Sequence, residues 1–281
     1  MKKWLKRLLL FVIILMVLGF VSSILSRLPL GDRVAVVKVK GALVDPDRIV
    51  VRIQQAKEDK SVKALVLRVD SPGGSVGASQ EIYRALEDFK TSGKPLVVSM
   101  GNVSASGGYY ISAPADVIFA NPGTITGSIG VIVQHTELKD LLERLGIRTT
   151  AIKTGKFKDT LSPFRGLSEE EKEYLNRTIQ DAYEQFLQAI LKYRSKRISE
   201  DKLREVADGR VLTGRVAKEL GLVDELGNLQ DAINRARQLA KAPEARVFYM
   251  EEKRGILRRL MEEDLQGLGN HYPLMLYYLM K

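Results

Sequence analysis

The sequence predicts an α/β protein built from parallel strand–helix–strand units, preceded by one transmembrane helix and followed by a helical C-terminal region. Three observations carry this prediction. Short apolar runs rich in Val and Ile alternate with amphipathic helical segments between residues 33 and 152. From residue 168 onward the pattern becomes helical, and residues 8–25 carry no charge at all. Alternation of strands and helices at this spacing is typical of parallel βαβ units.

The individual elements follow from periodicity and from capping residues. We expect helices over residues 47–59, from the turn after residue 74 to residue 89, and over 138–145, 168–194 and 228–241. Ser168, followed by three glutamates, has the form of a helix start, and Ser199 and Thr213 read as further N-caps. The expected strands are residues 33–39, 64–69, 95–100, 117–120, 129–134 and 148–152.

The N-terminal apolar run is long enough to cross a membrane. As a helix, residues 8–25 would span about 27 Å, close to the thickness of a hydrocarbon core. Four positive charges precede the run and only Arg27 follows it closely, which predicts a cytoplasmic N-terminus and an extracytoplasmic remainder. A cleaved signal peptide is the alternative, although no clear A-x-A site follows. We therefore expect a single-pass cell-membrane protein.

The chain divides into three expected parts. Residues 1–28 form the basic end and the anchor, residues 29–241 the α/β domain, and residues 242–281 a C-terminal extension. Residues 272–280 of this extension are strongly apolar. Such a tail either docks onto the core or occupies a groove.

Composition excludes several classes of function. The net charge is +10, but five positive charges lie ahead of the first acid, Asp32, and the rest are interspersed with acids. No nucleic-acid partner is expected from that distribution. The absence of cysteine excludes a thiol nucleophile and Cys-based zinc sites. His135 and His271 have no metal-ligand spacing, and we expect neither a metal nor a cofactor.

The stretch of residues 100–132 contains the candidate nucleophile, Ser106. An apolar run at 95–100 leads into small residues around Ser106, and a helical segment begins near Gly107. A serine at a strand-to-helix turn lies where backbone N–H groups and the positive helix end favour a developing anion. Taken alone, the pattern is more simply read as a small-residue turn packed under a sheet.

Without a usable His or Cys, a nucleophilic serine needs a lysine as its base. Residues 154–159 offer Lys156 and Lys158. A lysine acts as a base near neutral pH only if its pKa falls from about 10.4 towards neutrality, which burial away from carboxylates can impose. Taken singly, either is more simply a surface residue. Ser199 and Lys202 also match S-x-x-K, but Ser199 reads better as a helix cap.

Glycines and a second serine complete the candidate site. Gly73 follows a buried strand, and its N–H, with that of Gly107, would form an oxyanion hole. The alternative is an ordinary Pro-Gly turn. Ser128 has a hydroxyl that would either orient an amine or cap a strand.

Five ordered motifs together resemble the signal peptide peptidase A family in its short, single-repeat form. They are DSPGG, MGNVSASGGYYISAPAD, TGSIGV, TGKFKD and DGRVLTGRVAKELGLVDELG. The resemblance runs from about residue 34 to residue 240, besides the anchor. It implies a ClpP/crotonase-like superhelix of βαβ units. Ser104 departs from the family, which more often has Ala there.

The resemblance also implies roles for the candidate residues. Ser106 matches the nucleophile, Lys158 the general base and Ser128 the serine that holds the lysine amine. Gly73 and Gly107 match the oxyanion hole, and Lys156 falls where the family varies. The implied protein is a membrane-anchored serine endopeptidase that cleaves apolar peptides such as remnant signal peptides, without metal or cofactor. Its subunits would form a ring in which neighbours share each Ser/Lys dyad.

Two other functions stay open from the sequence. A crotonase-like acyl-CoA enzyme would share the fold and a glycine oxyanion hole. The serine, the lysine motif, the anchor and the lack of a carboxylate pair argue against it. A catalytically silent membrane scaffold is the other alternative.

Overall fold

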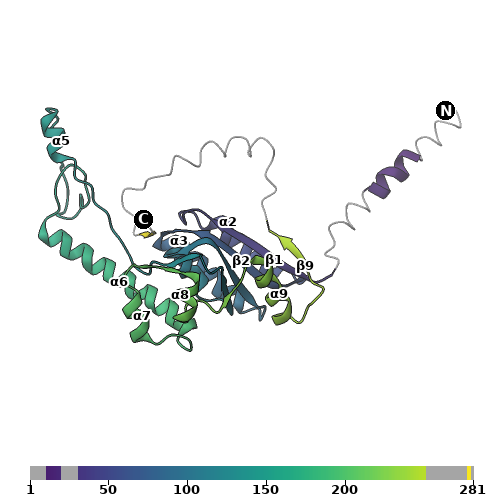
Figure 1. Ribbon diagram of the computed structural model, residues 1–281. Helices are drawn as coiled ribbons and strands as arrows, with labels where there is room; N and C mark the ends of the chain where they lie inside the picture. The colour runs from purple at the N-terminus through teal and green to yellow at the C-terminus, as the bar shows by residue number, and fades with distance from the viewer. Residues whose placement is uncertain (1–10, 20–30, 251–276, 280–281) are drawn as a thin grey trace, which may run out of the picture.

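The computed structural model describes residues 11–19, 31–250 and 277–279, and its centre is a largely parallel sheet (Figure 1). The strand order is β7-β6-β4-β2-β1-β9, with β5 paired to β4 and β8 to β5. These pairs are parallel except β6 with β7, so the predicted α/β class is confirmed. The strands are β1 (Arg33–Lys40), β2 (Val62–Ser71), β4 (Leu96–Ala105), β5 (Val117–Ala120), β6 (Ile125–Gly127), β7 (Val211–Thr213), β8 (Glu225–Leu226) and β9 (Arg246–Tyr249).

Helices cover both faces of the sheet. Because side chains alternate along each strand, neighbouring residues of a strand pack against the helices on opposite faces. Val34 and Val36 of β1 share one apolar cluster with α9 (Leu229–Leu239). Ala35 and Val37 face the other cluster. That second cluster contains side chains from α2 (Asp47–Glu58), α3 (Val76–Lys90), α4 (Gly107–Ser112) and α6 (Glu169–Arg194). Burial on both faces explains why the central strands read as continuous apolar runs.

The predicted helix caps are present. The Ser168 hydroxyl accepts the N–H of Glu171, whose side chain accepts the N–H of Ser168, which is a full capping box at the start of α6. The Ser199 hydroxyl accepts the N–H of Lys202 at the start of α7 (Glu200–Val206), and the Thr213 hydroxyl accepts that of Val216 at the start of α8 (Gly214–Glu219). These short side chains satisfy N–H groups that have no acceptor within the helix.

Two expected strands, residues 129–134 and 148–152, do not form. β6 stops at Gly127, because Ser128 adopts a positive φ of 50° that turns the chain out of the sheet. The chain then enters residues 131–168, which we call the arm; it contains the helix α5 (Lys139–Arg144) and projects beyond the sheet (Figure 1). Ile152 is 100% exposed there. Ile129 is still buried in the core, whereas Ile132, like Ile152, is exposed, so the apolar pattern beyond residue 130 marks exposed surface instead of sheet.

A buried ion pair fastens the end of α6 to the sheet. Arg194 is fully buried and donates hydrogen bonds to both carboxylate oxygens of Asp224, at 2.8 and 3.0 Å. It also donates to the carbonyl of Gly221 at 3.0 Å. Asp224 in turn accepts the N–H of Ile118 in β5 at 2.8 Å. The pair therefore joins α6 to β5 through a desolvated contact.

The described part of the N-terminal end is an exposed helix, whereas the described part of the C-terminal end is a strand paired with the domain. Residues 11–19 form a helix whose large apolar side chains are exposed, from Val12 at 40% to Met16 at 63%. The rest of the expected span, 8–10 and 20–25, lies outside the described residues. No helix in the described ranges has the length and apolar content to span a bilayer. Within the apolar tail, β10 (Tyr277–Leu279) pairs antiparallel with β3 (Gly73–Ser75), and the rest of residues 272–280 also lies outside the described part.

Candidate active site

Ser106 occupies a strained turn between β4 and α4. It follows Ala105, the last residue of β4, and has φ 53° and ψ −118°. Its N–H donates to the carbonyl of Gly127 at 2.8 Å, and its carbonyl accepts the N–H of Tyr110 at 2.9 Å. The residue is 1% exposed, and among the described residues its hydroxyl forms no hydrogen bond. The backbone is thus held in a costly conformation while the hydroxyl stays uncommitted, a pattern typical of functional sites.

Ser128 lies beside Ser106 because of how β4 pairs. The first part of β4 pairs with β5, and its last part, Val103 to Ala105, pairs in parallel with β6. Ala105 stands opposite Gly127, so Ser106 and Ser128 each follow the end of neighbouring strands. Ser128 also has positive φ, and its N–H donates to the carbonyl of Arg210 at 2.7 Å. The structure therefore brings together the two serines that the sequence singled out.

Gly73 and Gly107 also meet. A Cβ placed on Gly107 would lie 3.2 Å from Gly73 Cα and 3.2 Å from Gly74 N. Gly107 begins α4, where the first N–H groups have no acceptor within the helix. The Gly73 N–H donates to the Ser71 hydroxyl at 3.1 Å. The two proposed donors are therefore close, and the sequence analysis missed Ser71 as the resting partner of one of them.

Lys158 is the predicted site residue that stands apart. It lies in the arm, its side chain is exposed, and within the described ranges that side chain forms no hydrogen bond or ion pair. The other two lysines of this segment differ, because Lys153 pairs with Asp159 and Lys156 pairs with Glu170. Of the three, Lys158 alone has an amine that no carboxylate in the described part of the chain holds. The ion pair of Lys156 therefore distinguishes it from Lys158, a distinction that the residue pattern of 154–159 did not provide.

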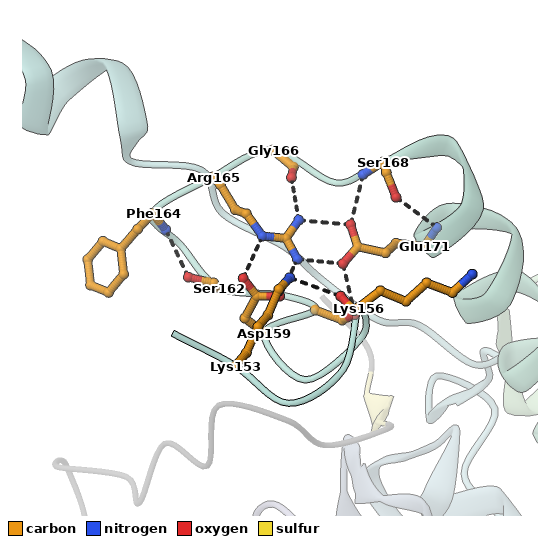
Figure 2. A network of polar contacts seen from close by, with 10 residues as sticks. Lys153, Lys156, Asp159, Ser162, Phe164, Arg165, Gly166, Ser168 and Glu171 are labelled. Atoms are coloured by element: carbon orange, nitrogen blue, oxygen red, sulfur yellow. Dashed lines mark hydrogen bonds and ion pairs between the residues drawn. The ribbon is translucent and has the colours of Figure 1, made fainter. Parts of the chain in front are cut away.

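Arg165 links two acids, Asp159 next to Lys158 in the sequence and Glu171 in the first turn of α6; Figure 2 shows these contacts. Its guanidinium donates to both carboxylate oxygens of Asp159, at 2.9 and 2.6 Å, and to both of Glu171, at 2.8 and 2.5 Å. Hydrogen bonds from Arg165 hold the pKa of each carboxyl well below its usual range. Glu171 also accepts from the Thr160 hydroxyl at 2.9 Å. The capping-box pattern at Ser168 was the only sequence signal for any of these contacts.

Two further features border the site. A cavity of about 500 Å³ opens beside Ser128, and Ile132, Ile179, Tyr183 and Val211 contribute to its lining. On the other side, β10 lies along β3, with Tyr278 opposite Gly74. An extended segment can therefore pair with the strand that carries Gly73. The described residues contain no group of His, Asp or Glu side chains placed to hold a metal ion.

Comparison with protein-family models decides the family, because the model of peptidase family S49 matches residues 88–243. The chain belongs to peptidase family S49. A Synechocystis protein provisionally named as a protease is 42% identical over 83% of this chain and 84% of its own. Protease 4 of Salmonella typhi is 36% identical over 83% of this chain, which spans 38% of that protein. The chloroplastic serine protease SPPA of Arabidopsis thaliana is 37% identical over 75% of this chain and 33% of its own length.

These relatives identify this S49 chain as a serine peptidase of the SppA group. A solved structure supports the fold: a mutant of the 1510-N membrane-bound stomatin-specific protease superposes with a TM-score of 0.54. It is 16% identical and covers 80% of this chain and 100% of its own. The mixed α/β fold with a parallel sheet is thus shared with another peptidase, as the sequence resemblance implied.

Proposed function

We propose that this S49 peptidase is a membrane-anchored endopeptidase that cleaves apolar peptides, typified by remnant signal peptides. Ser106 is the nucleophile and Lys158 the general base. The observation that carries the proposal is the Ser106 turn, whose uncommitted hydroxyl lies at a helix N-terminus beside the backbone of Gly73 and Ser128. That arrangement supplies a nucleophile, backbone donors and an amine-orienting hydroxyl in one place.

The reaction follows from these groups. The neutral Lys158 amine takes the Ser106 proton as the oxygen attacks the peptide carbonyl. N–H groups of Gly73 and Gly107 stabilise the resulting oxyanion, with Gly73 exchanging its Ser71 partner for the substrate oxygen. The lysine then protonates the leaving amine, and water hydrolyses the acyl-enzyme with the amine again acting as base. No step in this scheme needs a metal or a cofactor.

We further propose that the lysine reaches the serine of a neighbouring subunit in a ring. Support comes from the arm, where Lys158 is exposed and large apolar side chains face solvent in the single chain: Ile132, Leu138, Leu141, Leu145, Ile147, Ile152 and Phe164. Exposed apolar surface of this kind marks a contact with another protein. The cavity beside Ser128 is a suitable place for a neighbour to insert a side chain.

The membrane location rests on the N-terminal segment. Residues 8–25 are uncharged, and the described helix at 11–19 exposes its apolar side chains. We propose a cytoplasmic N-terminus with residues 29–241 outside the cytoplasm as the peptidase domain, and residues 242–281 as an extension.

Subunit mixing tests the nucleophile, the base and their sharing together. Ser106→Ala and Lys158→Ala should each lower kcat/KM on a signal-peptide substrate by about a thousand-fold or more. Lys156→Ala is the matched control and should retain activity. Fluorophosphonate should label wild-type Ser106. When the two inactive variants are co-assembled, activity should return, because one variant supplies the serine and the other the lysine.

Each result decides a separate claim. Full activity in either single variant rejects the dyad. No recovery in mixed assemblies rejects sharing between subunits. No Ser106-dependent hydrolysis by the wild-type assembly favours the scaffold alternative.

A further inference from the structure

We propose that Arg165 is a positioning residue for Lys158. It holds the neighbouring Asp159 carboxylate away from the Lys158 amine and fastens the Lys158 segment to the first turn of α6. This inference rests on the proposed role of Lys158 as general base.

Both chain neighbours of Lys158 are fixed to α6 or its cap. The Phe157 ring stacks on Tyr174 of α6, with centroids 5.2 Å apart and planes 27° from parallel. On the other side, Asp159 is held by Arg165, which also holds Glu171 in the first turn of α6. Lys158 lies between these two anchors. Its own side chain is therefore presented outward from a segment whose neighbours cannot easily move.

The fork geometry of Arg165 matters because one guanidinium serves two carboxylates. It contacts Asp159 through Nε and Nη2 and Glu171 through Nη1 and Nη2 (Figure 2). Glu171 is 3% exposed, so the contact is partly withdrawn from water. A lysine at position 165 would offer a single point charge and could not satisfy both acids in this planar manner.

Three nearby carboxylates are engaged by cations other than Lys158. Asp159 pairs with Arg165 and Lys153, Glu171 with Arg165, and Glu170 with Lys156. The charged groups of this segment and of the elements against it are Lys153, Lys156, Asp159, Arg165, Glu169, Glu170, Glu171 and Lys172, with Lys172 on Glu169, and Glu137, whose carboxylate lies beside Gly166. Within residues 31–250, this arrangement leaves the Lys158 amine without a counter-ion.

A general base must lose its proton, and a free carboxylate beside it would oppose that loss. Asp159 is the nearest acid in the sequence to Lys158. If Arg165 is removed, Lys153 still pairs with Asp159 Oδ1, but Oδ2, which accepts from Arg165 Nε, loses its cation. That oxygen can then pair with the ammonium form of Lys158, which a nearby opposite charge favours by about one pH unit or more. The acidic limb of the activity profile should then move to higher pH.

The test is a pH profile of kcat/KM for the assembled full-length enzyme on a signal-peptide substrate. Arg165→Met should move the acidic limb up by roughly one unit, giving about a ten-fold loss at neutral pH that disappears at high pH. Asp159→Asn alone should leave the limb in place. The double variant, Arg165→Met with Asp159→Asn, should return the limb to the wild-type position. A purely structural role of Arg165 would not be relieved by the second change.

Arg204→Met is the matched control, since Arg204 bridges Glu184 and Glu200 in the same way outside the arm. It should leave the limb unmoved. If Arg165→Met fails to assemble in gel filtration, Arg165→Lys carries the test and should show a smaller shift of the same sign. An unshifted limb in the folded Arg165 variant, or a double variant that stays shifted, overturns the proposal. If fluorophosphonate does not label Ser106 in the wild-type enzyme, the proposed function itself is rejected.

Discussion

The contact between Gly107 and β3 allows the proposed oxyanion hole to be tested with one methyl group. In Gly107→Ala the new Cβ would lie 2.6 Å from the Ser79 hydroxyl and 3.2 Å from Gly73 Cα. Ser79 is fully buried, and its hydroxyl donates to the Ser75 carbonyl at 2.9 Å, so it yields only by giving up that bond. The backbone of β3 must also retreat by a few tenths of an ångström.

Overpacking of this kind costs about 1–3 kcal/mol in the free energy of unfolding. For a domain of this size, that lowers the melting temperature by roughly 2–12 °C. Displacing a donor from the oxyanion should cost about a hundred-fold in kcat, with a smaller change in KM. Thermal unfolding and steady-state kinetics measure the two effects separately.

Two further variants separate packing from catalysis. Gly107→Ala combined with Ser79→Ala removes the hydroxyl clash, so stability should recover in part while kcat stays low. Gly77→Ala is the matched control, because nothing lies within 4 Å of its new Cβ, and it should be neutral or slightly stabilising. A Gly107→Ala enzyme with wild-type kcat would refute the placement of the oxyanion hole between Gly73 and Gly107.

Arg194→Met should lower the free energy of unfolding by about 3 kcal/mol, because it removes the buried guanidinium from Asp224 and leaves only the half-exposed Arg197 as a cation for this buried carboxylate. Denaturant unfolding measures this, and a loss below about 1 kcal/mol would contradict the account of that ion pair. Deleting the residues after Asn270 removes β10 from β3. We expect peptide turnover to rise several-fold at low substrate concentration or self-cleavage to change, since an attached segment competes at high effective concentration. Identical kinetics and an identical self-cleavage pattern would show that the tail does not occupy the substrate path.

Much of the fold could be predicted from the sequence, because local capping residues and the burial pattern indicate the same elements. Residues 64–69 are apolar except for Arg68, since both faces of β2 are covered, and a strand of that kind has few other interpretations. The helix starts at Ser168 and Asn228 are equally local, because a capping side chain contacts N–H groups only two or three residues away. These features need no knowledge of the tertiary structure.

The misread parts depend on distant neighbours. Residues 129–134 and 148–152 have strand-like patterns, but a strand needs a partner, and Ser128 turns the chain away from β4. The contact of Arg165 with two acids could not be chosen from the sequence, because several acids and bases lie within reach of one another there. The adjacency of Ser106 and Ser128 likewise required β4 to be long enough for both β5 and β6.

β3 has one side already filled. Leu43 donates its N–H to the Gly73 carbonyl and accepts the Ser75 N–H, both at 2.8 Å, and a Cβ on Gly74 would lie 2.1 Å from the Leu43 carbonyl oxygen. An incoming polypeptide therefore has only the opposite margin of β3 to join, in the direction that Tyr277–Leu279 takes. Because successive side chains of an extended chain point to opposite sides, only every second side chain of the bound peptide would contact the protein. Peptide specificity would then depend on alternate positions, and the positions between them would accept almost any residue.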